Sequence, residues 1–304
     1  MFICSFFRFL GDKMGKMQYN EETGEVSYMP KVFHHTSNEC YNWLKQQPHV
    51  KEESLTDWLL YTVSKQTNRI YYKSFSRNEE SLNGADWEWW ILTNTNKDLY
   101  AYRFLVQAKK LKRDCDNYPL ISYGNRNGLQ IDLLLQAAKN RNAMPLYLYY
   151  SCSKPNLKEQ LKNINFLDSR IITWCETCIN GAYLSMAHSI KKKVFGSPRV
   201  DITDVELLNN SLALSTCDIL FGDLHDIRTL LQNLNHQYIT LENIDIYKCH
   251  GAFGIMHNEN AFPNYLKTLI KRKNEDLDWM DYEYRHGLNG ISGVAVIDLR
   301  TTDY

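Results

Sequence analysis

Two short segments constrain this chain most, because each carries charged side chains among bulky apolar residues. The first is GADWEWW at residues 84–90, and the second ends in QAK at residues 107–109. Aromatic and branched residues favour strands, and turn formers at residues 83–84 and 93–96 bracket the first segment. We therefore expect the two segments to be neighbouring strands of a hairpin.

Strand alternation predicts which of these side chains share a face. Successive residues of a strand point to opposite faces, so Asp86 and Glu88 share one face, as do Gln107 and Lys109. If the two faces coincide, carboxylates and an ammonium group converge. Buried charges are costly unless they pair or hold a cation. A divalent cation, Mg²⁺ or Mn²⁺, would compensate them and would suit hydrolysis of a phosphodiester.

A plainer interpretation of the same residues stays open. Asp86 and Lys109 can form a structural ion pair, with Gln107 satisfying a backbone group. Short patterns of this kind also occur by chance. The hairpin alone therefore favours neither interpretation.

The order of the predicted elements adds evidence for a site. Residues 52–63 have apolar side chains at the spacing of one helical face, and they begin with Glu52 and Glu53. Acids in a first helical turn suit the helix dipole, so these glutamates are either helix-start residues or metal ligands. Further elements are expected as a strand at 69–75, the two strands of the hairpin, a buried helix at 128–139 and a strand at 145–150. The predicted order is helix, three strands, helix, strand.

With these elements in place, the chain resembles the restriction endonuclease-like, or PD-(D/E)xK, superfamily, whose core has the same order. The resemblance over residues 45–152 is to an uncharacterised bacterial family of nuclease-like proteins. The residues that carry it are ESLTD at 53–57, GADWEW at 84–89, QAK at 107–109 and Gln130. A weaker similarity continues through WCETC at 174–178 and GVAVIDL at 293–299. Members of that family often look like parts of anti-phage defence systems.

The resemblance implies a role for each matching residue. It makes Asp86 the central metal ligand, Glu53 the helix-borne acid that completes the metal site, and Lys109 the catalytic lysine. Gln107 departs from the pattern, because many members have an acid two residues before the lysine. An amide oxygen can ligate a metal without contributing charge, so the Gln107 carbonyl is the expected third ligand.

Four further residues are candidates for the same site: Glu52, Glu80, Glu88 and Gln130. A single carboxylate would hold Mg²⁺ poorly, so a glutamate must join Asp86, and the sequence leaves open which one does so. In similar nucleases a polar residue at the position of Gln130 faces the substrate or supports the lysine. An amide on a helix is more often only a surface group, so both alternatives remain for Gln130.

The net charge and the basic clusters limit which molecules the protein is expected to bind. The formal net charge is zero, with 35 basic and 35 acidic residues, which argues against a nonspecific DNA coat. Phosphate contacts are expected from the basic cluster directly after the catalytic lysine, formed by Lys110, Lys112 and Arg113. Such a run can also be a solvated face.

The eight cysteines have no secretory context and no framework spacing, which predicts a reduced cytoplasmic protein. Cys175 and Cys178 have the spacing of half a zinc site, with Cys217 or the Cys249 and His250 pair as completions. Free cysteines that pack as small hydrophobes are the preferred interpretation. No apolar run is long enough to span a membrane.

We expect an α/β fold with a restriction endonuclease-like core and a mixed sheet at residues 45–152. An N-terminal extension at 1–44 precedes it, and a C-terminal α+β elaboration at 153–304 packs on it. Within the elaboration we expect a helix that contains Ala182, Leu184, Met186 and Ile190.

The expected function is a Mg²⁺-dependent endonuclease that hydrolyses phosphodiester bonds, with DNA favoured over RNA as the substrate and a role in anti-phage defence. The alternative is a nuclease-fold protein without catalysis that serves as a nucleic-acid recognition or assembly subunit. Neutral Gln107 keeps this alternative open. A homo-oligomer or a defence-system partner is compatible with both functions, and no membrane association is expected.

Overall fold

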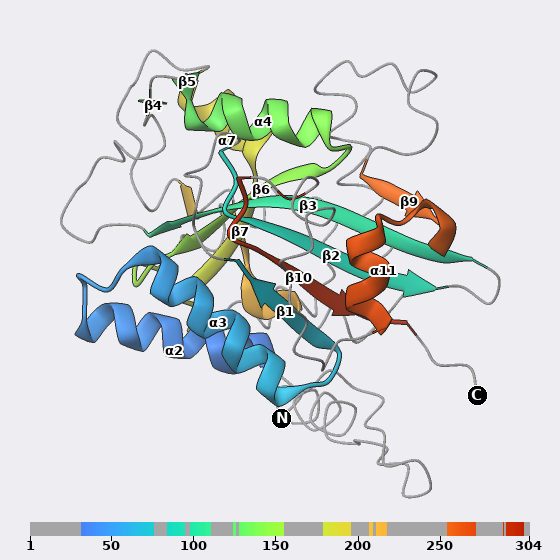
Figure 1. Ribbon diagram of the computed structural model, residues 1–304. Helices are drawn as coiled ribbons and strands as arrows, with labels where there is room; N and C mark the ends of the chain where they lie inside the picture. The colour runs from blue at the N-terminus through green and yellow to red at the C-terminus, as the bar shows by residue number, and fades with distance from the viewer. Residues whose placement is uncertain are drawn as a thin grey trace, which may run out of the picture.

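A mixed sheet with helices on both faces organises the protein (Figure 1). The computed structural model describes residues 32–75, 84–94, 98–110, 124–125, 128–154, 179–195, 207–208, 211–217, 254–271, 288 and 290–300. Within these ranges, eight strands form one sheet in the order β1-β10-β2-β3-β6-β7-β8, and β9 pairs with β3. This confirms the predicted α/β class and the mixed sheet.

The first half of the chain follows the predicted order of elements. Its members are α2 (Val32–Gln46), α3 (Glu52–Gln66), β1 (Ile70–Ser74), β2 (Trp87–Asn94), β3 (Leu99–Lys110), α4 (Gln130–Asn140) and β6 (Met144–Tyr150). A small hairpin of β4 (Gly124–Asn125) and β5 (Gly128–Leu129) comes directly before α4. From α3 to β6 the order helix, three strands, helix, strand is confirmed.

The second half of the chain adds more strands to the same sheet and more helices around it. Its members are β7 (Ala182–Met186), α7 (Ala187–Phe195), β8 (Leu212–Ala213), η1 (Leu214–Thr216), β9 (Ile255–His257), η2 (Glu259–Ala261), α11 (Asn264–Lys271) and β10 (Gly293–Asp298). No helix in the described ranges is long and apolar enough to cross a membrane.

The predicted hairpin is confirmed, and its register determines the geometry of the candidate site. β2 and β3 pair antiparallel, with Trp87 opposite Val106 and Glu88 opposite Leu105. β3 pairs in parallel with β6, where Tyr147 lies opposite Gln107. Residues from three elements of the predicted core are therefore placed side by side.

The sheet order corrects the predicted division of the chain. β10 lies between β1 and β2, antiparallel to the first and parallel to the second. The segment GVAVID is a nearly continuous apolar run, which is typical of a strand that is buried on both faces. Residues 293–298 are therefore a central part of the core sheet and not an elaboration on it.

The N-terminal boundary also moves. Helix α2 begins inside the predicted N-terminal extension, and its Phe33, Cys40 and Leu44 side chains are buried in the core. They pack with α3 against one face of the sheet, while α4, α7 and α11 pack against the other face (Figure 1). The described core therefore extends well beyond residues 45–152 at both ends.

The helix expected around Ala182 to Ile190 is wrong for its first half. Ala182, Leu184 and Met186 lie on strand β7, and Ile190 lies on the following helix, α7. A spacing of two residues between apolar side chains is the period of a strand, and pairing with β6 satisfies it. The strand period was therefore present in the sequence.

Candidate active site

Asp86 and Gln107 meet at the end of the β2–β3 hairpin. The Asp86 N–H donates to the Val106 carbonyl at 2.9 Å and continues the ladder by one residue. The Asp86 Oδ2 atom accepts hydrogen bonds from Gln107 Nε2 at 2.5 Å and from the Ala108 N–H at 2.9 Å. The two predicted residues thus share one face of the sheet, and the carboxylate is held against β3.

Gly84 brings this carboxylate close to helix α4. Its φ of +69° is a left-handed conformation that few side chains tolerate. A Cβ atom there would lie 2.5 Å from the Gln130 carbonyl oxygen and 2.7 Å from the Leu134 nitrogen. Only glycine therefore allows the chain before Asp86 to lie directly against the first turn of α4.

We expect Gly84→Ala to destabilise the fold, because the methyl group meets backbone atoms that cannot rotate away. The cost of the strained φ and the displaced helix should be about 1–3 kcal/mol in the free energy of unfolding. Urea unfolding would measure it, with Gly128→Ala as the comparison. Gly128 also has a positive φ, of +124°, but its added Cβ would have no atom within 4 Å. If both variants lose the same free energy of unfolding, the close contact between Gly84 and helix α4 is not the cause of the loss.

Gln130, the first residue of α4, extends the contacts of Gln107. Its Nε2 atom donates to Gln107 Oε1 at 2.8 Å. We call the hydrogen-bonded chain Gln130, Gln107 and Asp86 the amide relay. The structure therefore places the partly buried Gln130 side chain in contact with Gln107 at the site, which fits the interpretation that it supports the site residues.

Lys109 is buried, with 8% of its surface exposed, and it follows Gln107 on the same face of β3. Its side chain has neither a hydrogen bond nor an ion pair with the residues that the structure describes. Its positive charge nevertheless acts on Glu52, whose pKa it lowers. Lys109 thus lies close to the carboxylates without being tied into a short ion pair.

Glu52 occupies the position that the sequence analysis assigned to Glu53. Its Oε2 atom accepts a hydrogen bond from the Lys110 N–H at 2.6 Å, whereas Glu53 is exposed. Glu52 lies three residues before buried Leu55 and seven before Leu59, which is the spacing of one helical face. This periodicity could have distinguished the two glutamates in the sequence.

The Glu52 carboxyl group is held in an unusual electrostatic state. Its pKa is raised to about 7, mainly by burial, with the positive charge of Lys109 opposing this rise and the nearby negative charge of Asp86 adding to it. Glu52 and Asp86 therefore act on each other as like charges. A cation between them would remove the cost of keeping both ionised.

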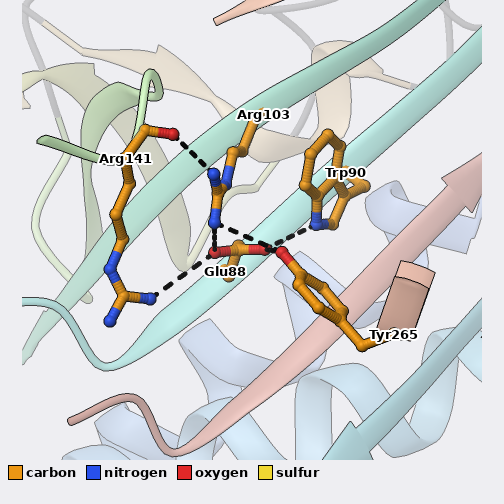
Figure 2. A network of polar contacts seen from close by, with 5 residues as sticks. All are labelled: Glu88, Trp90, Arg103, Arg141 and Tyr265. Atoms are coloured by element: carbon orange, nitrogen blue, oxygen red, sulfur yellow. Dashed lines mark hydrogen bonds and ion pairs between the residues drawn. The ribbon is translucent and has the colours of Figure 1, made fainter. Parts of the chain in front are cut away.

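Glu88 does not belong to this site. It lies on the same face of β2 as Asp86 but is completely buried in a separate set of contacts, which we call the Glu88 network (Figure 2). Its donors are Trp90 Nε1 at 2.7 Å, Arg103 Nη2 at 2.8 Å and the Tyr265 hydroxyl, and Arg141 Nη1 lies 3.8 Å away. With its oxygens engaged in this way, Glu88 is a structural anchor and not a metal ligand.

Lys110 also has a structural role. Its Nζ atom donates to the carbonyl oxygens of Pro48 at 2.9 Å and Val50 at 2.5 Å, which fastens the end of β3 to the segment before α3. The expected phosphate contact from Lys110 is therefore replaced by a contact within the chain. Several other candidates lie outside the described residues: Lys112, Arg113, Glu80, Cys175, Cys178, Cys249 and His250.

The donor set suits Mg²⁺ better than zinc. No three His, Cys, Asp or Glu side chains converge as a metal-binding group within the described ranges. Glu52 and Asp86 supply two carboxylates, and Mg²⁺ commonly uses one or two carboxylates together with water and phosphate oxygens. A structural zinc site needs four nitrogen or sulfur ligands. Two carboxylates are therefore a donor set that Mg²⁺ accepts, whereas the ligands of a structural zinc site are not gathered among the described residues.

Sequence reasoning missed Tyr147, which lies next to the site, and the residues that hold Glu88 away from it. Tyr147 on β6 is completely buried opposite Gln107, and nothing in its aromatic strand distinguishes it. Arg103 and Tyr265 hold Glu88, although a single arginine within the apolar strand β3 was a signal for a buried ion pair.

Comparison with known proteins gives a family and no function. The model of a family of unknown function (DUF6615) matches residues 29–300. No curated protein and no solved structure matches the chain. The matched range takes in every described helix and strand from α2 to β10, including all residues of the candidate site.

Proposed function

Because this chain belongs to DUF6615, a family whose function is unknown, we propose a function from its own residues: a metal-dependent nuclease that cleaves DNA. One observation carries the proposal. The Asp86 carboxylate accepts a hydrogen bond from the Ala108 N–H at 2.9 Å and the Glu52 carboxylate accepts one from the Lys110 N–H at 2.6 Å, so the two acids are held on either side of Lys109 along β3. Two acids and one buried lysine are the groups needed to bind a cation and a phosphodiester together.

Each residue has a role in the proposed reaction. Glu52 and Asp86 would hold Mg²⁺, with the amide relay keeping the Asp86 carboxylate in place. When bound, Mg²⁺ supplies Lewis-acid polarisation of the phosphate and a lowered pKa of water. Lys109 would neutralise negative charge that develops on the phosphate, and its burial makes that interaction stronger than it would be in water.

The proposal also covers the superfamily, the biological role and the cellular location of the protein. The order of elements from α3 to β6 agrees with the superfamily that the sequence resembles. An anti-phage role rests on that resemblance alone. A cytoplasmic location is supported by Cys40, Cys152 and Cys217, which are free thiols in the structure.

Plasmid DNA cleavage with Mg²⁺ tests the function. Lys109→Met is expected to lower the cleavage rate at least about a hundredfold, because it removes the positive charge that faces the phosphate. Asp86→Asn should lower it by a similar factor or more. Lys139→Met is the control, since Lys139 is an exposed lysine on α4.

The outcomes separate the two functions considered for this chain. Cleavage that requires Mg²⁺ and disappears in the Lys109 and Asp86 variants, but not in the Lys139 variant, supports the nuclease. DNA binding without cleavage under any divalent metal favours the recognition or assembly subunit. Cleavage that survives in Lys109→Met would contradict the role given to this lysine.

A further inference from the structure

The orientation of the Gln107 amide follows from its neighbours. One amide atom of Gln107 lies 3.0 Å from the carbonyl oxygen of Ala108, which can only accept a hydrogen bond, so this atom is the nitrogen Nε2. The same Nε2 atom donates to Asp86 Oδ2, and Gln107 Oε1 accepts from Gln130. Donation in the amide relay therefore runs in one direction, from Gln130 to Gln107 to Asp86.

Two buried polar atoms lie beside this relay without a partner among the described residues. They are Gln130 Oε1 and the hydroxyl of Tyr147. Tyr147 is completely buried on the strand next to Gln107, directly opposite it in the register. Both side chains belong to the layer between the sheet and α4. One atom is an acceptor and the other a donor, and a buried polar atom without a hydrogen bond is costly.

The hydroxyl of Tyr147 keeps its proton at all ordinary pH values. Burial raises its pKa far above the usual range, and the negative charges of Asp132 and Asp86 raise it further. Tyr147 is therefore a permanent O–H donor close to the relay.

We propose that Tyr147 is a positioning residue of the nuclease site, whose hydroxyl donates to Gln130 Oε1 through one bridging water molecule. The chain of donation then runs from Tyr147 through Gln130 and Gln107 to Asp86. Each hydrogen bond fixes the orientation of the next amide. Gln107 thus holds the Asp86 carboxylate with its nitrogen, in place of the carbonyl ligand that the sequence suggested, and the Asp86 carboxylate would hold the cation. This inference rests on the proposed function.

The test is a double-mutant cycle of Tyr147→Phe and Gln107→Leu, in which the phenylalanine keeps the ring and removes only the hydroxyl. Tyr147→Phe should lower DNA cleavage about tenfold at saturating Mg²⁺, as supporting residues of metal sites do. If Tyr147 acts through the relay, the double variant should be no slower than Gln107→Leu alone. Tyr183→Phe is the control, because this buried tyrosine on β7 donates instead to the Asn180 carbonyl.

The Gln107→Glu variant shows whether Gln107 donates a hydrogen bond to Asp86 or ligates the cation with its carbonyl oxygen. A donor at this position predicts slower cleavage, since the glutamate would place an oxygen against Asp86 Oδ2. A carbonyl ligand predicts retained cleavage at a lower Mg²⁺ concentration, and that result would overturn the proposal. Wild-type cleavage rates in Tyr147→Phe, or losses that multiply in the double variant, would overturn it as well.

The same double-mutant cycle can be measured by urea unfolding without Mg²⁺, and this measurement does not require the protein to cleave DNA. Non-additive unfolding free energies of Tyr147→Phe and Gln107→Leu support the relay, and additive ones overturn it. If the wild-type protein cleaves nothing, the proposed function fails while the hydrogen-bond chain is still measured. A failure of the proposed nuclease function is thereby distinguished from a failure of the hydrogen-bond chain.

Discussion

Glu52→Gln is expected to abolish cleavage and, at pH 8, to make the protein more stable than the wild type. Cleavage falls because one of the two carboxylates at the site is lost. Supporting residues of a metal site contribute 10–100-fold, so the loss of a ligand should exceed about a thousandfold. The gain in stability follows from the raised pKa of the Glu52 carboxyl.

The direction of this pH effect follows from the proton balance. The Glu52 carboxyl has a pKa of about 7 in the folded protein. In an unfolded chain a glutamate has a pKa of about 4.3, so the unfolded state loses its proton first as the pH rises. Stability therefore falls between these two pH values, with a total cost on the order of 3 kcal/mol above pH 7. Glutamine does not titrate and escapes this cost.

Urea unfolding at pH 4.5 and pH 8 measures the effect. The wild type and Glu52→Gln should have similar unfolding free energies at the lower pH and diverge as the pH rises. Glu53→Gln is the matched control, because it makes the same change in the same helical turn at an exposed position. It should stay within about 0.5 kcal/mol of the wild type and keep its cleavage activity. If Glu52→Gln is less stable than the wild type at pH 8, Glu52 is a structural partner of Lys109 and the metal site is in doubt.

Glu88→Ala is expected to cause the largest loss of stability among the single substitutions considered. Glu88 is completely buried, and its carboxylate is the partner of the buried Arg103 guanidinium (Figure 2). Removal of one partner leaves the other charge buried and uncompensated, which costs about 3–5 kcal/mol. The Tyr265 hydroxyl and the Trp90 Nε1 donor lose their acceptor at the same time. Urea unfolding at pH 7 would measure the loss.

A double variant shows whether the cost comes from the unpaired charge. Glu88→Leu together with Arg103→Met removes both charges, so it should recover most of the stability that Glu88→Ala loses. An equally unstable double variant would instead attribute the loss to packing. Cleavage per folded molecule should not change, because the Glu88 carboxylate is held by Trp90, Arg103 and Tyr265, whereas Asp86 is held by Gln107 and the Ala108 N–H.

The local part of the site was predictable because it depends on strand alternation. A hairpin places every second residue on one face, so Asp86 was expected beside Gln107 and Lys109 if the faces of the two strands coincided. The same rule placed Glu88 on that face, but it gave no information on which distant side chains surround it. Arg103 and Tyr265 make Glu88 a structural residue, and Tyr265 comes from α11, far along the chain.

The assignment of the helix acid shows a second difference between sequence and structure. Glu52 and Glu53 both suit a first helical turn, and the resemblance selected Glu53. One residue corresponds to about 100° of rotation around a helix, so only one of the two can face the sheet. The buried face of α3, marked by Leu55 and Leu59, selects Glu52.

The sequence by itself determined the class of fold, the order of elements from α3 to β6 and the sharing of one strand face by Asp86 with Glu88 and by Gln107 with Lys109. These depend on side-chain periodicity and on neighbouring strands, which are local properties of the chain. Only the tertiary structure decided that β10 lies between β1 and β2, that Glu88 is held by Arg103 and Tyr265, and that Tyr147 lies beside the amide relay. Those contacts join segments distant in sequence, and they form because buried strands and buried charges must find partners wherever the fold brings them together.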